Sequence, residues 1–107
     1  KMRIYRHGDI LLKQIADIPK NAKLLNTKVL AEGEATGHLH EFMGKVKIYD
    51  IDSTTSEEIT SKFVEILEAS QLTHPEHKTL IIEPGNYQVI RENEWDYFSE
   101  EIRRVQD

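Results

Sequence analysis

Short runs of aliphatic and β-branched residues, bounded by turn signals, constrain the fold of this chain more than any other feature. The clearest runs are residues 10–15, 28–32, 45–50, 78–82 and 86–91. Within 45–50, Val46 and Ile48 alternate with charged or polar neighbours, which is the pattern of a strand with one buried face. Runs of this length and composition predict strands, so we expect a mainly β chain.

Glycine, proline and small polar residues separate these runs. The segment His7-Gly8-Asp9 predicts a turn, and the polar residues 20–27 predict a loop or a single helical turn. Pro84-Gly85 lies between two β-rich runs and predicts a hairpin. Residues 99–105 begin with a serine, carry acids in the first turn and arginines near the end, and therefore predict a short C-terminal helix.

Residues 59–72 fit two structures. Ile59, Phe63 and Ile66 follow a helical stripe, whereas the alternation within 62–68 fits a strand. We favour the strand because the neighbouring segments are strand-like and the preceding strand needs a partner.

A chain of 107 residues is expected to form one domain, spanning residues 1–107. The predicted architecture is a small barrel or sandwich of about six strands with the short C-terminal helix. Exposed strand edges in so small a β-domain favour a homo-oligomer. Cysteine is absent and the apolar runs are too short to span a bilayer, so we expect a cytoplasmic protein without membrane contact.

Charge is distributed unevenly along the chain. The net charge is −5, with nine Lys/Arg against five Asp/Glu in residues 1–48 and five against fourteen in residues 49–107. The acidic second part argues against a broad nucleic-acid surface there, because phosphate binding needs clustered cations. A local site could still accept a small-molecule or RNA ligand.

Four of the five histidines occur in two short segments. His38 and His40 are two apart and would project from the same face of a strand. His74 and His77 flank Pro75-Glu76, so either a β-turn or one helical turn would place their imidazoles side by side. These spacings predict a shared site if the two segments meet in space.

The leading hypothesis is that these four histidines bind a divalent transition metal such as zinc or nickel. Imidazole is a borderline ligand for both metals. Three histidines with an open position would indicate catalysis, and four would indicate a closed site. Glu41, Glu76 or Asp9 could replace or orient a histidine. His7, the fifth histidine, is interpreted as an ordinary surface or core residue.

Two other functions stay open. The same histidines could act without metal as the acid and base of a ribonuclease or phosphodiesterase, with Tyr87 and Arg91 as possible helpers, because imidazole titrates near neutral pH. Alternatively, the histidines could stabilise the fold or the oligomer of a non-enzymatic binding module.

Several segments together resemble a family of small uncharacterised prokaryotic and phage proteins. They are Arg6-x-Gly8-Asp9-Ile10-Leu11-Leu12, Glu34-x-Thr36-Gly37-His38-x-His40, Leu72-Thr73-His74-x-Glu76-His77, Pro84-Gly85-x-Tyr87-x-Val89 and Glu100-Glu101-Ile102-Arg103-Arg104-Val105. The resemblance implies a prokaryotic or viral origin and favours the strand at 62–68, but it implies no activity.

Overall fold

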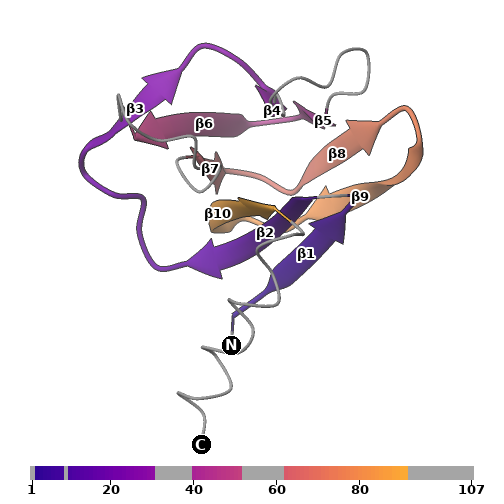
Figure 1. Ribbon diagram of the computed structural model, residues 1–107, viewed down its shortest axis with the longest axis horizontal. Helices are drawn as coiled ribbons and strands as arrows, with labels where there is room; N and C mark the ends of the chain where they lie inside the picture. The colour runs from indigo at the N-terminus through magenta and orange to yellow at the C-terminus, as the bar shows by residue number, and fades with distance from the viewer. Residues whose placement is uncertain (1, 9, 31–39, 52–61, 92–107) are drawn as a thin grey trace, which may run out of the picture.

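Ten β-strands in two antiparallel sheets make up the part of the chain that the structure describes. The computed structural model describes residues 2–8, 10–30, 40–51 and 62–91 (Figure 1). The strands are β1 (Ile4–His7), β2 (Ile10–Ile15), β3 (Ala22–Leu25), β4 (Val29–Leu30), β5 (His40–Met43), β6 (Val46–Ile51), β7 (Lys62–Ile66), β8 (Ser70–His74), β9 (His77–Ile82) and β10 (Gly85–Arg91). The predicted mainly β fold is confirmed, and the expected helix at 99–105 lies outside the described residues.

The two sheets are two halves of one folded meander. One sheet has the strand order β1-β2-β10-β7-β6-β3, and the other has the order β4-β5-β8-β9. The chain passes from one sheet to the other between β3 and β4, β5 and β6, β7 and β8, and β9 and β10. The order β3-β6-β7-β10 in the larger sheet therefore corresponds to the order β4-β5-β8-β9 in the smaller sheet, strand by strand. β2 and β1 extend the larger sheet beyond β10 (Figure 1).

Gly44 allows two neighbouring bends of the chain to lie close together. Gly44 lies between β5 and β6 with a φ of 133°, and a side chain at this position would overlap the side chain of Ser70. The Leu67 N–H donates to the Lys45 carbonyl at 2.9 Å, which joins this bend to the neighbouring one between β7 and β8. A residue with a Cβ would push the two bends apart, so glycine is required here.

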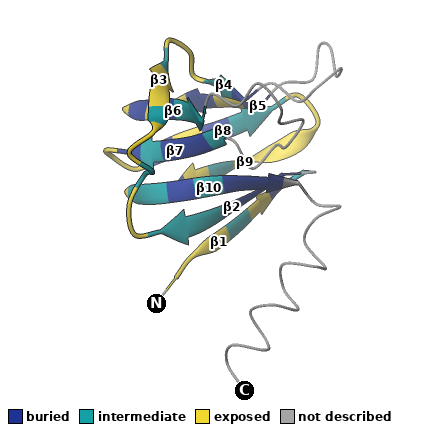
Figure 2. Cartoon of the chain, turned by 60° about the vertical axis from the view of Figure 1, so that its left-hand side comes forward, coloured by how far each residue is buried: buried dark blue, intermediate teal, exposed yellow. Residues whose placement is uncertain are grey.

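The hydrophobic core lies between the sheets. Its fully buried side chains include Leu12, Phe42, Ile48, Leu72 and Tyr87. Figure 2 shows buried segments in β7, β8 and β10, and an exposed surface along β9 and the start of β1. Burial of each large apolar side chain contributes about 1.5–3 kcal/mol, so this core holds the two sheets together.

The prediction of a loop or helical turn at residues 20–27 is wrong. Residues 22–25 form β3, in which Lys23 pairs with Asp50 and Leu25 pairs with Ile48. Polar side chains misled the prediction because β3 is an edge strand with a solvent-facing side, where strand propensity is decided by pairing and context.

The prediction of a hairpin at Pro84-Gly85 is also wrong. β9 and β10 belong to different sheets, so this segment is a bend and the two strands do not pair with each other. Two tyrosine hydroxyls bind the backbone of the bend: the Glu83 N–H donates to Tyr5 at 3.2 Å, and Tyr87 donates to the Glu83 carbonyl at 2.7 Å. These contacts occupy both backbone groups of Glu83, which in a hairpin would pair with the opposite strand.

The strand prediction at 62–68 is confirmed over the length of β7. Val64 pairs with Ile48 and Ile66 pairs with Val46, which gives β6 the partner that the sequence demanded. The chain then bends and continues as β8. Ten short strands are present in place of the expected six or so, because a bend between the sheets separates β3 from β4, β5 from β6, β7 from β8 and β9 from β10. Among the described residues there is no helix of the length and apolar character needed to cross a membrane.

Candidate functional site

Four imidazoles from four strands meet at the end of the smaller sheet that lies away from the bends. His7 ends β1, His40 begins β5, His74 ends β8 and His77 begins β9. The ring centroids are separated by 5.0 Å (His7–His40), 6.2 Å (His7–His74), 5.7 Å (His7–His77), 4.5 Å (His40–His74), 6.2 Å (His40–His77) and 4.4 Å (His74–His77). We call these four residues the histidine cluster.

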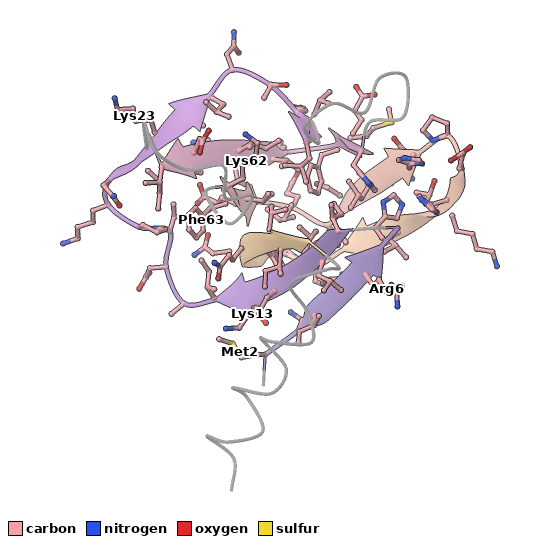
Figure 3. The ribbon with its side chains drawn as sticks, viewed as in Figure 1. Met2, Arg6, Lys13, Lys23, Lys62 and Phe63 are labelled. Atoms are coloured by element: carbon pink, nitrogen blue, oxygen red, sulfur yellow. The ribbon has the colours of Figure 1, made fainter. Side chains whose placement is uncertain are left out.

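Strand alternation directs three of the rings inward. His40 shares its face with the core residue Phe42, while Glu41 between them is exposed. His74 is two residues from the buried Leu72. On β1, Arg6 points away from the core (Figure 3), so its neighbour His7 faces inward and is buried. In each case residues two apart share a face of the strand.

A β-bulge brings in the fourth ring. Leu72 pairs with Leu80, but His74 pairs with His77, so one residue of β8 faces two residues of β9 between these pairs. Without the extra residue, Lys78 would oppose His74. Bulges re-aim side chains in this way, and here the bulge places the imidazole of His77 beside that of His74. Of the two predictions for this segment, the β-turn is confirmed, because His74 and His77 close the hairpin between β8 and β9.

Hydrogen bonds define the tautomers of the two buried rings. Nε2 of His7 lies 2.9 Å from the Lys78 carbonyl, which can only accept, so this nitrogen carries a proton. In the neutral ring Nδ1 is then an acceptor. Nδ1 of His40 lies 2.8 Å from it and must be the donor. The pair therefore shares one proton between its two Nδ1 atoms.

Burial favours the neutral form of His7. His7 and His40 are 2% and 1% exposed, whereas His74 is half-buried and His77 is exposed. Burial lowers the pKa of His7, and the charges of His77 and His74 lower it further, against an opposing effect of the Lys78 carbonyl. A neutral imidazole is the form that binds metal ions.

Gly8 forms one wall of the cluster. Its φ is +65°, and a Cβ at this position would lie 2.5 Å from Nε2 of His77, 2.7 Å from Cδ2 of the same ring and 3.3 Å from Cε1 of His40. Both the backbone angle and the lack of space therefore require glycine. The β1–β2 turn thus serves the cluster as well as the hairpin.

The ring spacing suits one metal ion, but the present ring orientations do not. Four imidazoles placed tetrahedrally around zinc, with bonds of about 2.0–2.1 Å, would have centroids about 5.2 Å apart, and the observed distances bracket this value. Two ligand nitrogens would then be about 3.3 Å apart, whereas the Nδ1 atoms of His7 and His40 are 2.8 Å apart and hydrogen-bonded. Within the described residues, no group of three or more His, Asp or Glu side chains already has metal-site geometry.

His74 also has to break a contact before it can bind a metal through Nδ1. The Glu76 N–H donates to that nitrogen at 3.0 Å, and Glu76 itself is exposed. In the described structure the rings are therefore joined by hydrogen bonds, and they would have to rotate before they could bind one ion together.

The structure brings together three of the four predicted ligands, His40, His74 and His77. His38 lies outside the described residues, as does Asp9. The structure adds His7, which sequence reasoning missed because it stands alone in a turn segment. A usable signal was the alternation on β1, where the charged Arg6 separates Tyr5 from His7 and so predicts that both face the core.

Neither proposed helper is shown to join the cluster. Tyr87 is fully buried, and its hydroxyl donates to Glu83 at the bend between β9 and β10. The backbone of Arg91 pairs with Ile10 at the end of β10, and its side chain lies outside the described part of the structure.

Comparison with known proteins gives a family assignment and no activity. A family model described as "Domain of unknown function (DUF8820)" matches residues 6–92. No curated protein and no solved structure shows significant similarity to the chain. The matched region contains all four residues of the histidine cluster.

Proposed function

We propose that this chain, which belongs to the DUF8820 family of unknown function, binds a divalent transition ion, zinc or nickel, through the histidine cluster. The spacing of the rings supports this most directly: six centroid distances from 4.4 to 6.2 Å surround the value expected for one tetrahedral ion. Four imidazoles, in a chain that has no cysteine, suit these borderline metals.

The contacts of His7 add independent support. Metal-binding histidines usually donate their other ring N–H to a carbonyl or carboxylate, which fixes the ring and raises its basicity. His7 already donates from Nε2 to the Lys78 carbonyl at 2.9 Å, which leaves Nδ1 facing the other rings. Replacement of the proton between the two Nδ1 atoms by an ion would keep this outer hydrogen bond.

Elemental analysis of protein purified without an affinity tag tests the proposal. We expect one zinc or nickel ion per chain, or a dissociation constant below about 1 μM when the metal-free protein is titrated against a competing chelator. Protein that carries no stoichiometric metal and binds neither ion with that affinity would refute the proposal.

Substitutions then identify the ligands. His7→Gln keeps a donor toward the Lys78 carbonyl but removes the nitrogen that would bind the metal. Loss of a group that only contacts a ligand weakens metal binding by about 10–100-fold. We therefore expect loss of a ligand itself to weaken metal binding at least a hundredfold. His38→Ala is the matched comparison, because the sequence predicts His38 as a ligand and the structure brings His7 to the cluster. A large loss in His38→Ala with none in His7→Gln would reverse the assignment.

The hydrogen bond between His7 and His40 favours a second candidate, metal-free cleavage of RNA or a small phosphodiester by histidine acid–base chemistry. Burial of both rings weighs against it, because a general acid or base must reach its substrate. Cleavage that persists in chelator and disappears in His74→Ala would favour this candidate over the metal site. A cytoplasmic location, a prokaryotic or phage source and a homo-oligomeric state are predictions from the sequence.

A further inference from the structure

β1 and β9 lie side by side without pairing through their backbones. β1 is an edge of the larger sheet and β9 is an edge of the smaller one. Figure 1 shows β1 running alongside β9 where the two sheets approach each other. In the described ranges β1 pairs with β2 and β9 pairs with β8, and no residue pairing joins β1 to β9. We call this junction the β1–β9 seam.

Side chains of β1 take the place of the missing backbone ladder. Tyr5 and His7 are two apart on β1 and share its inner face. The Tyr5 hydroxyl accepts from the Glu83 N–H at 3.2 Å, and His7 donates to the Lys78 carbonyl at 2.9 Å. A hydrogen bond contributes only about 0.5–1.5 kcal/mol net, so two such bonds close the seam less firmly than a ladder would.

The histidine cluster spans the same seam. His7 approaches from β1, whereas His74 and His77 belong to the β8–β9 hairpin. An ion held by rings from both sides would join the two edge strands, which no backbone ladder joins in the described ranges. Four imidazoles would also fill the tetrahedral positions of zinc, which is typical of structural sites.

We infer that the ion at the histidine cluster acts as a structural clip that fastens β1 to β9 and closes the β1–β9 seam. This inference rests on the proposed metal binding. It gives the metal a role in holding the fold, and it assigns no reaction to the ion.

Hydrogen–deuterium exchange of the full chain, with zinc or with chelator, tests the clip. At a zinc concentration about a hundred times the dissociation constant, we expect exchange in β1 and β9 to slow by tenfold or more. Exchange in β6 and β7, which lie within the larger sheet, should slow much less. Equal slowing in all four strands, or zinc binding with no slowing in β1 and β9, would overturn the clip and leave the metal site intact. Absence of zinc binding would overturn both proposals.

Tyr5→Phe sharpens this experiment because it removes the other fastening of the seam. In chelator we expect β9 of this variant to exchange roughly fivefold faster than in the unmodified protein, the factor for one lost hydrogen bond, and zinc should abolish most of the difference. Tyr49→Phe is the matched control, since it removes a tyrosine hydrogen bond to Glu65 at 3.0 Å on β7, away from the seam. Equal acceleration of β9 in both variants would contradict the clip.

Discussion

The two ends of the β1–β9 seam use the same kind of contact with different chemistry. At the bend end, which comprises Tyr5, Tyr87 and Glu83, two phenol hydroxyls bind the Glu83 backbone and the rings pack edge to face at 5.8 Å. At the cluster end, His7 binds the Lys78 carbonyl in the same way. In both cases an aromatic side chain binds a backbone group that lies on β9 or directly after it.

The difference lies in what each ring has left after making this contact. A phenol has one polar atom, and burial together with Tyr5 raises the pKa of Tyr87 to about 12, so Tyr87 stays protonated at neutral pH. An imidazole has two nitrogens, and His7 keeps its second one directed at His40. The phenols at the bend end therefore keep no second ring nitrogen, whereas the metal site that we propose at the cluster end uses the nitrogen that His7 keeps.

Truncation of Tyr87 should give the largest effect on the fold. Tyr87 is 0% exposed in the core, so Tyr87→Ala should lower the free energy of unfolding by about 3–5 kcal/mol. Chemical denaturation in chelator measures this change. His77→Ala is the comparison at the other end: because His77 is exposed, it should cost less than about 1 kcal/mol in chelator. Similar losses in the two variants would show that both ends carry the fold equally.

Local patterns in the sequence predicted most of the strands but not where the sheets divide. The alternation in 45–50 and 62–68 identified β6 and β7, because that pattern depends only on which face is buried. The bend at Pro84-Gly85 was mistaken for a hairpin because its course depends on a contact with Tyr5, which is distant from it in the sequence. Tertiary contacts of this kind leave no local signature.

The same limit applies to the histidine cluster. His74 and His77 were recognisable as neighbours because the turn between them is local. The position of His7 depends on the way β1 folds back along β9, and the bulge that turns His77 inward depends on pairing with β8. Spacing in the sequence therefore identified histidine as the residue type of the site and His74 and His77 as neighbours. The position of His7 and the inward direction of His77 follow from the topology.

High pH should weaken the bend end selectively. Tyr87 remains protonated in the folded state until about pH 12, whereas in the unfolded chain it loses its proton near 10. The unfolded state therefore binds fewer protons between these values, and the free energy of unfolding should fall as pH rises from 10 to 12, by up to about 2 kcal/mol. The same titration on Tyr87→Phe should lack this part of the slope. An unchanged slope would show that Tyr87 does not carry the alkaline transition.

Gly8→Ala should weaken the cluster end with a limited effect on the fold. The added Cβ would lie 2.5 Å from Nε2 of His77, an exposed residue beside a turn, so the ring should swing away and zinc affinity should fall about tenfold. Gly85→Ala is the matched control: its φ of +151° makes it similarly strained, but its nearest neighbour is Nε2 of Gln14 at 3.2 Å. Both should lower stability by about 1–2 kcal/mol, and only Gly8→Ala should change metal affinity. Equal affinities would place His77 outside the ligand set.

Low pH should weaken the cluster end of the metal-free protein. The groups that face His7 are the rings of His40, His74 and His77 and the carbonyl of Lys78. Burial and the neighbouring rings hold the pKa of His7 below its usual 6.5, so the unfolded chain takes up its proton first as pH falls. The free energy of unfolding in chelator should therefore decrease as pH drops below about 6.5. In His7→Gln the decrease should be smaller, while Tyr87 at the bend end stays protonated throughout this range. Two results would contradict this: a free energy of unfolding that rises on acidification, or a pH dependence that is unchanged in His7→Gln. Either would show that His7 is not buried as a neutral ring, and the contrast between the two ends of the seam would then be lost.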